Sequence, residues 1–233
     1  LRALDVARVL APTFGAWFLR ERGTERSRAG LSRRFRVAAE RLGPTYIKLA
    51  QIISAGKGVF PDELVAECRK CRDQVSPVPY ADIVEVVEAE LGQPLHKVFR
   101  TFDPTPLAAA SIAQVHTAVL RTGEEVVVKV QRPGIDALIR RDLRVLSWLA
   151  PFLVGRIPFT ALANPPALVE LFAETIIEEL DFRLEAANML DIAEVFVKLG
   201  RPNFVVPRPH PPHVTKRVLV MDPYDLNTRL RLA

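Results

Sequence analysis

The first part of the chain has the hydrophobic period of amphipathic helices, with apolar positions three and four residues apart. Proline stands where two of these runs restart, which suits the first turn of a helix, because the missing N–H of proline costs no hydrogen bond there. Gly92 follows the last run and would close it in the left-handed conformation that ends many helices. The pattern predicts helices up to residue 42 and over 44–56, 62–75 and 81–92.

The period changes after about residue 95, where short β-branched runs alternate every second residue and are separated by turns with proline or glycine. Residues 121–124 form a good hairpin turn, since Gly123 can take the positive φ that such a turn needs. The helical period then returns, and Asn164 and Pro165 mark the start of a long helix. We expect strands at 98–103, 114–120, 125–131 and 217–222, helices at 135–153 and 165–199, and a proline-rich loop at 201–213.

This order of elements predicts an α+β fold with a small, mostly antiparallel sheet. We expect two domains, a helical one over residues 1–95 and a sheet-containing one over residues 96–233. No internal repeat is visible.

One polar residue stands out in the strand EVVVKVQ. Alternation places Lys129 on one face with Val127 and Gln131, and the other three valines on the opposite face. Taken alone, Lys129 would be a snorkelling side chain on a half-exposed strand. However, the downstream helix carries several carboxylates, and an alanine-rich loop precedes the hairpin. Strand, loop, strand with lysine and helix with glutamate is the arrangement of a protein-kinase N-terminal lobe.

The composition is that of a globular protein, with 49% hydrophobic and 25% charged residues and a net charge of +5. Arginine is densest in residues 20–36. An anionic partner, either a membrane surface or nucleic acid, is one interpretation, but a solvated linker with i,i+4 Glu–Arg pairs is favoured. Aromatic residues are not interleaved there, so we expect no nucleic-acid binding. The sequence contains no run of about 18 apolar residues, the length of a membrane span.

Two further motifs invite a metal-site interpretation. Cys68 and Cys71 form a CxxC, but a four-cysteine zinc site needs a second pair, which the sequence lacks. We expect reduced, structural cysteines on neighbouring turns of one helix, in a reducing compartment. His210 and His213 lie in the proline-rich segment without further ligands, so a polar loop is favoured over a metal pair.

Four stretches of the chain resemble, in order, the motifs of the AarF/UbiB family of atypical kinases. They are GPTYIKLAQ (43–51), PLAAASIAQVH (106–116), VVVKVQRPG (126–134) and EELDFRLEAANM (178–189). Members of that family have an N-terminal extension with a KxGQ motif, an alanine-rich loop in place of the glycine-rich loop, and an ExD motif. The resemblance runs from about Leu42 to Met221. It implies a kinase-like N-lobe preceded by a helical extension.

The resemblance also implies roles for single residues. Lys129 is similar to the strand lysine that contacts nucleotide phosphates, and Glu185 to its catalytic ion-pair partner. The nucleotide-binding loop corresponds to Ala108, Ala109, Ala110 and Ser111, the KxGQ motif to Lys48 and Gln51, and the ExD motif to Glu179 and Asp181. The implied cofactors are ATP or ADP and Mg²⁺, with the metal ligands in a C-lobe and none in this chain.

The alanine-rich stretch has no glycine to allow positive φ or the closest approach to a phosphate. Its backbone N–H groups would still be available, along a stiffer and more crowded path. We therefore expect an altered nucleotide preference, ADP over ATP, and no ready protein-kinase activity.

Spacing makes two predictions about the other motifs. Lys48 and Gln51 are three residues apart, so a regular helix presents both on one face. Glu179 and Asp181 are two apart, which on a regular helix separates them by about 200°. We therefore predict an irregular helix near Leu180. Ala50 replaces the KxGQ glycine, which favours the helix by roughly 1 kcal/mol but puts close packing and the regulatory role of the motif in doubt.

No HxD…N or DFG pattern follows Met221, and we expect a fragment or a truncated gene product that does not transfer phosphate by itself. The main hypothesis is the ATP- or ADP-binding portion of an atypical kinase or ATPase of ubiquinone or related isoprenoid-lipid metabolism. Such a protein would be cytoplasmic, and peripheral at a membrane surface if it acts on isoprenoid lipid. The alternative is a non-catalytic, pseudokinase-like module that binds lipid or protein. The sequence does not predict an oligomeric state.

Overall fold

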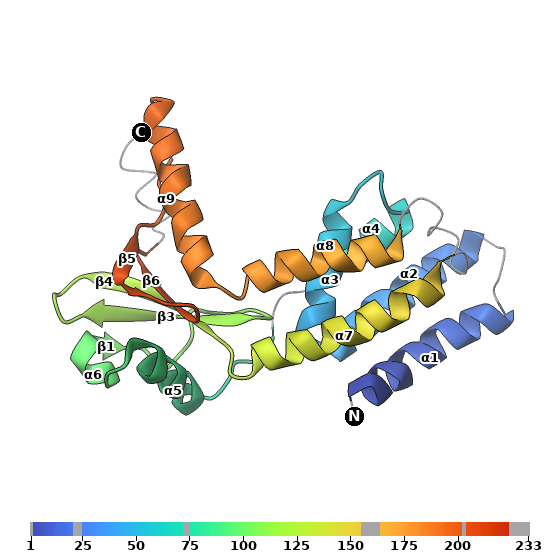
Figure 1. Cartoon of the computed structure of the whole chain (residues 1–233), viewed down its shortest axis with the longest axis horizontal. Coiled ribbons are helices and arrows are strands. Elements are labelled where there is room, and N and C mark those ends of the chain that lie inside the picture. The colour runs from blue at the N-terminus through green and yellow to red at the C-terminus, as the bar shows by residue number, and fades with distance from the viewer. Residues whose placement is uncertain (1, 21–24, 72–74, 155–163, 202–203, 224–233) are drawn as a thin grey trace. The chain divides into compact units, whose positions relative to one another are not determined.

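The computed structural model describes residues 2–20, 25–71, 75–154, 164–201 and 204–223, with only the backbone for residues 13, 14, 16–20 and 25–28. The chain divides into two compact units, each built from two separate segments. The helical unit comprises Leu1–Gln74 and Gly134–Ile176, and the sheet unit comprises Val75–Pro133 and Ile177–Ala233. Figure 1 shows the elements of both.

Six helices of the helical unit lie in the described ranges. Gly43, at φ +94°, separates the second from the third, and Pro44 opens the third, as the sequence predicts. The helix expected over 62–75 is shorter than predicted and ends at Cys68. The bounds are α1 Arg2–Arg20, α2 Glu25–Leu42, α3 Pro44–Ala55, α4 Asp62–Cys68, α7 Ile135–Leu153 and α8 Pro165–Glu178, whose last two residues belong to the sheet unit.

An ion pair on a buried carboxylate joins three of these helices. Arg2 on α1 donates from Nε to Asp142 Oδ1 on α7 at 2.6 Å, and from Nη2 to Asp142 Oδ2 at 3.0 Å. Thr45 on α3 donates its hydroxyl to Asp142 Oδ2 at 2.7 Å. Asp142 is fully buried, so these donors replace the water that its carboxylate loses on folding. The pKa of Arg2 is raised, chiefly by its hydrogen bond to Asp142.

The arginine-rich segment is helical from Glu25 onward. Arg36 forms an ion pair with Glu40 one turn later at 2.7 Å and with Glu67 on α4 at 3.1 Å. The favoured Glu–Arg pairing is therefore confirmed at Arg36. The side chains of residues 20–28 lie outside the described part of the chain.

The two cysteines are buried thiols outside any disulfide, but they do not share a helix. Cys68 is the last residue of α4, and the N–H of Cys71 bonds to the carbonyl of Cys68 at 3.0 Å in the turn that follows. Burial raises the pKa of Cys68 to about 12. Since the thiolate is the reactive form, this burial supports a structural role.

The sheet unit has an antiparallel sheet of strand order β1-β3-β4-β6-β5, with β2 paired to the other part of β3. The strands are β1 Phe99–Phe102, β2 Ala108–Ala109, β3 Ala113–Leu120, β4 Glu125–Gln131, β5 Pro209–Val214 and β6 Val218–Met221. Its helices are α5 Tyr80–Leu91, α6 Leu95–Val98 and α9 Phe182–Lys198. Gly92 closes α5 at φ +68°, and Gly123 has φ +98° in the β3–β4 turn, both as predicted.

Each face of this sheet carries its own apolar cluster. Val126, Val128 and Val130 pack with Ile83 and Val87 of α5 on one face. On the other face Ala113 and Leu219 pack with Phe182 and Ala186 of α9. The alternation predicted for β4 is therefore confirmed, and Lys129 belongs to the face that α9 covers.

One expectation about the last third of the chain is wrong. The proline-rich loop expected over 201–213 contains β5, an edge strand, where prolines are tolerated because no N–H is needed on the outer side. The long helical stretch expected over 165–199 is present as α8 and α9, interrupted near Leu180 as predicted.

The compact units also differ from the predicted division after residue 95. Helix α5 packs on the sheet, whereas α7 and most of α8 complete the helical unit. As a statement about separately folding domains, the division into residues 1–95 and 96–233 stays a prediction.

Candidate functional site

The candidate site is centred on Lys129 in the middle of β4. Its Nζ lies 2.7 Å from both Oε1 and Oε2 of Glu185, in the first turn of α9. The ammonium also stands 4.8 Å from the centroid of the Phe182 ring, which is a cation–π distance. The predicted Lys129–Glu185 pair is thus present. The two side chains are 26% and 39% exposed, so solvent and ligands can reach the pair.

A break between α8 and α9 places Glu185 at this lysine. α8 ends at Glu178, and Asp181 is the N-cap of α9, where its Oδ1 accepts a hydrogen bond from the backbone N–H of Arg183 at 3.1 Å. The irregularity predicted near Leu180 is confirmed. Glu185 therefore belongs to a new helix, whose N-cap lies four residues earlier.

Gln131 holds this break against the sheet. Its side-chain Nε2 donates to the carbonyl oxygen of Leu180 at 2.6 Å and to that of Lys216 at 3.1 Å. Gln131 is 1% exposed, so both bonds lie in a dry environment. It shares the face of β4 with Lys129, two residues away. The sequence pattern did not lead to a role for Gln131. A glutamine in an apolar strand is nevertheless a sign that its amide has hydrogen-bond partners.

The alanine-rich stretch lies in line with Lys129 across the sheet. Ala108 on β2 pairs with Val115 on β3, which pairs with Lys129 on β4. Neighbouring strands lie about 4.8 Å apart, which puts the Cα atoms of Ala108 and Lys129 roughly 10 Å from each other. The register therefore brings the alanine stretch to the lysine.

The backbone of this stretch differs from the open loop that the sequence suggested. Ala108 and Ala109 form a strand, and the N–H of Ala110 is engaged by the carbonyl of Ala113 at 2.9 Å. Not every N–H group here is thus available to a phosphate. No non-glycine residue in the described ranges has positive φ, which explains why alanine can stand where related loops have glycine. Ser111 is buried, at 2% exposure.

The ExD residues have different surroundings. Asp181 forms a two-point ion pair with Arg183, with Nε–Oδ1 and Nη2–Oδ2 distances of 2.8 and 2.6 Å. This arginine, followed by the cap hydrogen bond, lowers the pKa of Asp181. Glu179 is half-buried in the turn before it. Their regulatory role stays a prediction.

The KxGQ-like residues lie on α3 in the helical unit. Lys48 and Gln51 are both half-buried, and the spacing of three residues on a regular helix puts them on one face. Ala50 between them is 0% exposed. Its Cβ is thus accommodated in the core, and the helix is intact at the position where the family motif has glycine.

His210 is paired rather than free. Its Nε2 lies 2.9 Å from Oδ1 of Asp222, just beyond β6. Burial, followed by the proximity of His210, lowers the pKa of His213. Within the described ranges no group of three or more His, Cys, Asp or Glu side chains could hold a metal ion, so we assign no magnesium ligand to them. No helix in the same ranges is long and apolar enough to cross a bilayer.

An antiparallel sheet whose strand lysine pairs with a glutamate on the adjacent helix defines a protein-kinase-like N-lobe. Comparison with known proteins gives the same class. The family model described as the ABC1 atypical kinase-like domain matches residues 70–225. The chain belongs to this family.

Several relatives share most of this chain. The probable protein kinase UbiB of Cellvibrio japonicus is 38% identical over 189 residues, which are 81% of this chain and 34% of that protein. A chloroplastic aarF domain-containing protein kinase of Arabidopsis thaliana is 39% identical, over 78% of this chain and 34% of its own length. The chain therefore spans about a third of the length of these relatives.

A solved structure shares the fold. It is that of Rv3197 in complex with erythromycin, from Mycobacterium tuberculosis, with 29% identity and a TM-score of 0.54. The match covers 76% of this chain and 43% of that one.

Proposed function

We propose that this chain is the nucleotide-binding portion of an atypical kinase or ATPase. Lys129 would hold the phosphates of ATP or ADP, and Glu185 would orient its ammonium. The turn from Ala110 to Ser111 would cover the phosphates from the neighbouring strand. Mg²⁺, when bound with the nucleotide, would neutralise phosphate charge and would take its ligands from outside the described residues.

The observation that carries the proposal is the Lys129–Glu185 pair. A lysine held by one carboxylate at 2.7 Å, yet a quarter exposed, keeps part of its ammonium open to a phosphate oxygen. The register that places Ala108 in line with Lys129 supports the same ligand. Lysine is a common phosphate-binding residue, acting as a point charge.

For the whole protein we propose phosphotransferase or ATPase activity in ubiquinone or related isoprenoid-lipid metabolism, with peripheral attachment to a membrane surface. The proposal rests on the family and on relatives named protein kinase UbiB. The alternative is a non-catalytic module that binds lipid or protein. It would retain the fold but show no affinity for nucleotide.

Calorimetric titration with ADP and with ATP tests the site. We expect binding by the wild type, ADP more tightly than ATP, and its loss in Lys129→Ala. Lys97→Ala on α6 is the matched control, because Lys97 is exposed and lies on another element. Equal affinities of wild type and Lys129→Ala would refute the site, and no binding by the wild type would favour the alternative.

A further inference from the structure

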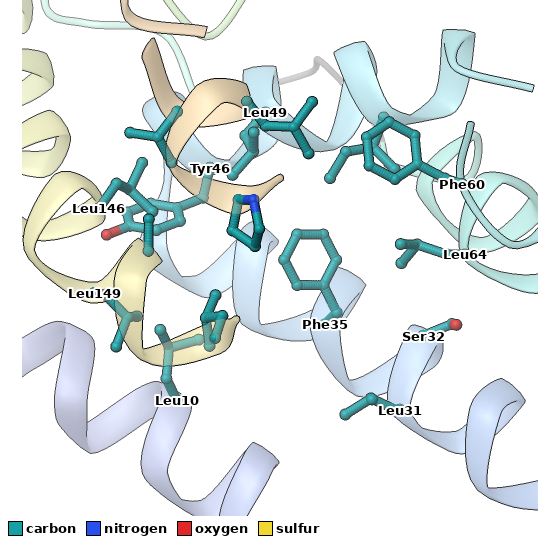
Figure 2. Close-up of a pocket in the computed structure, with 16 residues that line it drawn as sticks. Leu10, Leu31, Ser32, Phe35, Tyr46, Leu49, Phe60, Leu64, Leu146 and Leu149 are labelled. Atoms are coloured by element: carbon teal, nitrogen blue, oxygen red, sulfur yellow. The ribbon is translucent and has the colours of Figure 1, made fainter. Parts of the chain in front are cut away.

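The helical unit contains an apolar cavity that the proposed function does not use. Its volume is about 150 Å³, and no polar surface lines it. Figure 2 shows the side chains around it, with Phe35 between Tyr46 and Phe60 in this view. The lining residues are Leu10, Leu31, Ser32, Phe35, Tyr46, Leu49, Ile53, Phe60, Leu64, Leu146, Leu149, Ala150, Leu153, Pro165, Leu168 and Val169.

Burial differs around the lining. Tyr46 and Ala150 are each 2% exposed and belong to the core of the unit. Phe35, Leu49 and Leu168 are half-buried, so the cavity has a side from which a ligand can enter. Every lining residue belongs to the helical unit, and the site is therefore complete within it.

We propose that this cavity binds one uncharged aromatic ring. Its volume equals that of an engineered cavity lined by leucine, isoleucine and phenylalanine that stays dry and takes up benzene. The rings of Phe35, Tyr46 and Phe60 would favour offset or edge-to-face contacts with an aromatic guest. A polar guest would lose its hydrogen bonds to water and find none in the lining.

The Tyr46 hydroxyl does not change this choice of ligand. It is buried and has no hydrogen-bond partner within the described structure. Burial, and then the nearby Asp142, raise its pKa, so the phenol stays neutral. In Figure 2 the hydroxyl lies on the side of Leu146. The ring of Tyr46 is thus what the guest meets, and Tyr46→Phe should bind as the wild type does.

Thermal unfolding with increasing toluene tests the cavity, because a ligand that binds only the folded state raises Tm. We expect toluene to raise Tm of the wild type and benzamide, the same ring with a polar amide, to leave it unchanged. Ala150→Leu fills the cavity and should abolish the rise. Ala167→Leu is the matched control, since Ala167 is exposed on α8 and does not line the cavity.

A second pair keeps the test decisive if Ala150→Leu fails to fold. Leu168→Phe adds a ring to the lining, whereas Leu171→Phe changes a residue of the same helix that is 58% exposed. The toluene response should disappear only in Leu168→Phe. Three results would overturn the site: no rise in the wild type, an equal rise in the filled variants, or an equal response to benzamide.

A separate observation concerns the segment Val75–Pro79, here called the strap, which runs along the alanine-rich stretch. The N–H of Val75 donates to the carbonyl of Ala109 at 3.4 Å, and the N–H of Val78 donates to Oε1 of the buried Gln114. The strap is therefore tied to β2 and β3 at two points.

Arg132 adds two further ties with one side chain. Its Nη1 donates to the carbonyl of Ala110 at 3.0 Å, and its Nη2 donates to the carbonyl of Ser76 at 2.7 Å. Its backbone N–H bonds to the carbonyl of Ile112 at 2.9 Å. Burial lowers the pKa of Arg132 without a carboxylate among the causes. The planar guanidinium thus bridges the carbonyls of Ala110 and Ser76.

We infer that Arg132 is a positioning residue that fixes the Ala110–Ile112 turn and thereby sets nucleotide affinity. The link to affinity rests on the proposed function, whereas the link to the turn does not. Lysine has a single ammonium on a flexible stem and cannot reproduce a planar fork across two carbonyls. Arg132→Lys should therefore behave like Arg132→Ala.

Hydrogen exchange of the nucleotide-free chain tests the first link, and ADP titration tests the second. We expect Arg132→Ala and Arg132→Lys to speed exchange in residues 75–78 and 109–112, and to weaken ADP binding at least tenfold. Arg121→Ala in the exposed hairpin turn is the control. Unchanged exchange in Arg132→Ala, or full rescue by lysine, would overturn the inference. If Arg132→Ala speeds hydrogen exchange but the wild type binds no ADP, only the proposed function is contradicted.

Discussion

Each unit of the molecule contains an ion pair that joins two elements, and the two pairs have opposite surroundings. In the helical unit, both oxygens of the fully buried Asp142 are occupied by Arg2 and Thr45. In the sheet unit, the ammonium of Lys129 pairs with the carboxylate of Glu185, and both side chains are partly exposed. The carboxylate of the first pair is closed to solvent, whereas that of the second is 39% exposed and its ammonium retains a free donor.

This difference distinguishes an ion pair that stabilises the fold from an ion pair that is available to a ligand. A buried pair with every lone pair satisfied stabilises only as long as it is complete, because removing one partner leaves an unpaired charge in a dry environment. A half-exposed pair contributes little to stability, since water can replace either partner. It can therefore exchange a partner for a ligand at small cost. Four predictions test this contrast.

The largest effect is expected from Asp142→Ala. Loss of the carboxylate removes the partner of the buried Thr45 hydroxyl and of Arg2, whose side chain is 23% exposed and keeps its bond to the carbonyl of Leu42 at 2.7 Å. We therefore expect a loss of unfolding free energy of up to about 3–5 kcal/mol, the value for a fully buried pair. Urea unfolding followed by tryptophan fluorescence measures it, because Trp17 and Trp148 both belong to the helical unit. Asp136→Ala on the same helix is the control, since Asp136 forms a more exposed pair with Arg140. A loss no larger than that of the control would contradict a structural role for this pair.

Gln131→Leu should have the next largest effect. It keeps a side chain of similar size but removes the amide donor to the carbonyl of Leu180, which costs roughly 1–3 kcal/mol. The carbonyl of Lys216 keeps the backbone N–H of Phe182 as a donor at 3.1 Å. Urea unfolding followed by circular dichroism measures the loss. Hydrogen exchange should accelerate at residues 179–185, where the break is held. Unchanged exchange there would show that Gln131 does not hold the α8–α9 break.

Lys129→Ala and Glu185→Ala should each change unfolding free energy by about 1 kcal/mol or less, as expected for a half-exposed pair with one cation–π contact. The same variants should lose nucleotide affinity. Circular dichroism in urea and calorimetry with ADP measure the two effects on the same samples. A stability loss as large as that of Asp142→Ala would mean that the Lys129–Glu185 pair is structural.

The smallest effect concerns His213. Its pKa is lowered in the folded state by burial and then by His210, so the folded state favours the neutral ring. The associated stability is present above the ordinary histidine pKa of about 6.5 and is lost as the pH falls through the lowered value. Unfolding free energy should decrease slightly from pH 7.5 to 5.5, and less in His213→Gln. Identical pH profiles would refute this assignment.

Hydrophobic periodicity and the positions of proline and glycine predicted much of the fold. The helix over 135–153 and the strand over 125–131 have the predicted ends, because proline and glycine mark them in the sequence. The break near Leu180 was predicted from the angle of about 200° that would separate Glu179 and Asp181 on a regular helix. These features depend on residues close together in the chain.

The features that escaped prediction depend on residues far apart. Gln131 bonds to carbonyls 49 and 85 residues away, and Arg132 to one 56 residues away. Every residue has a backbone carbonyl, so no local sequence pattern predicts which carbonyls accept such bonds. β5 escaped for another reason: its prolines argue against a strand everywhere except at a sheet edge, and edge position is a property of the whole sheet.

The interleaving of the two units along the chain has a consequence for synthesis on the ribosome. The four helices up to residue 74 emerge first, but α7 and α8, which complete their unit, follow only after β1 to β4. At about 5–20 residues per second, synthesis of the intervening residues 75–133 takes about 3–12 s. During that time α1 and α3 lack α7, the helix that both of them contact in the folded unit. A nascent chain paused near residue 130 would thus be a substrate for chaperones that bind exposed helices.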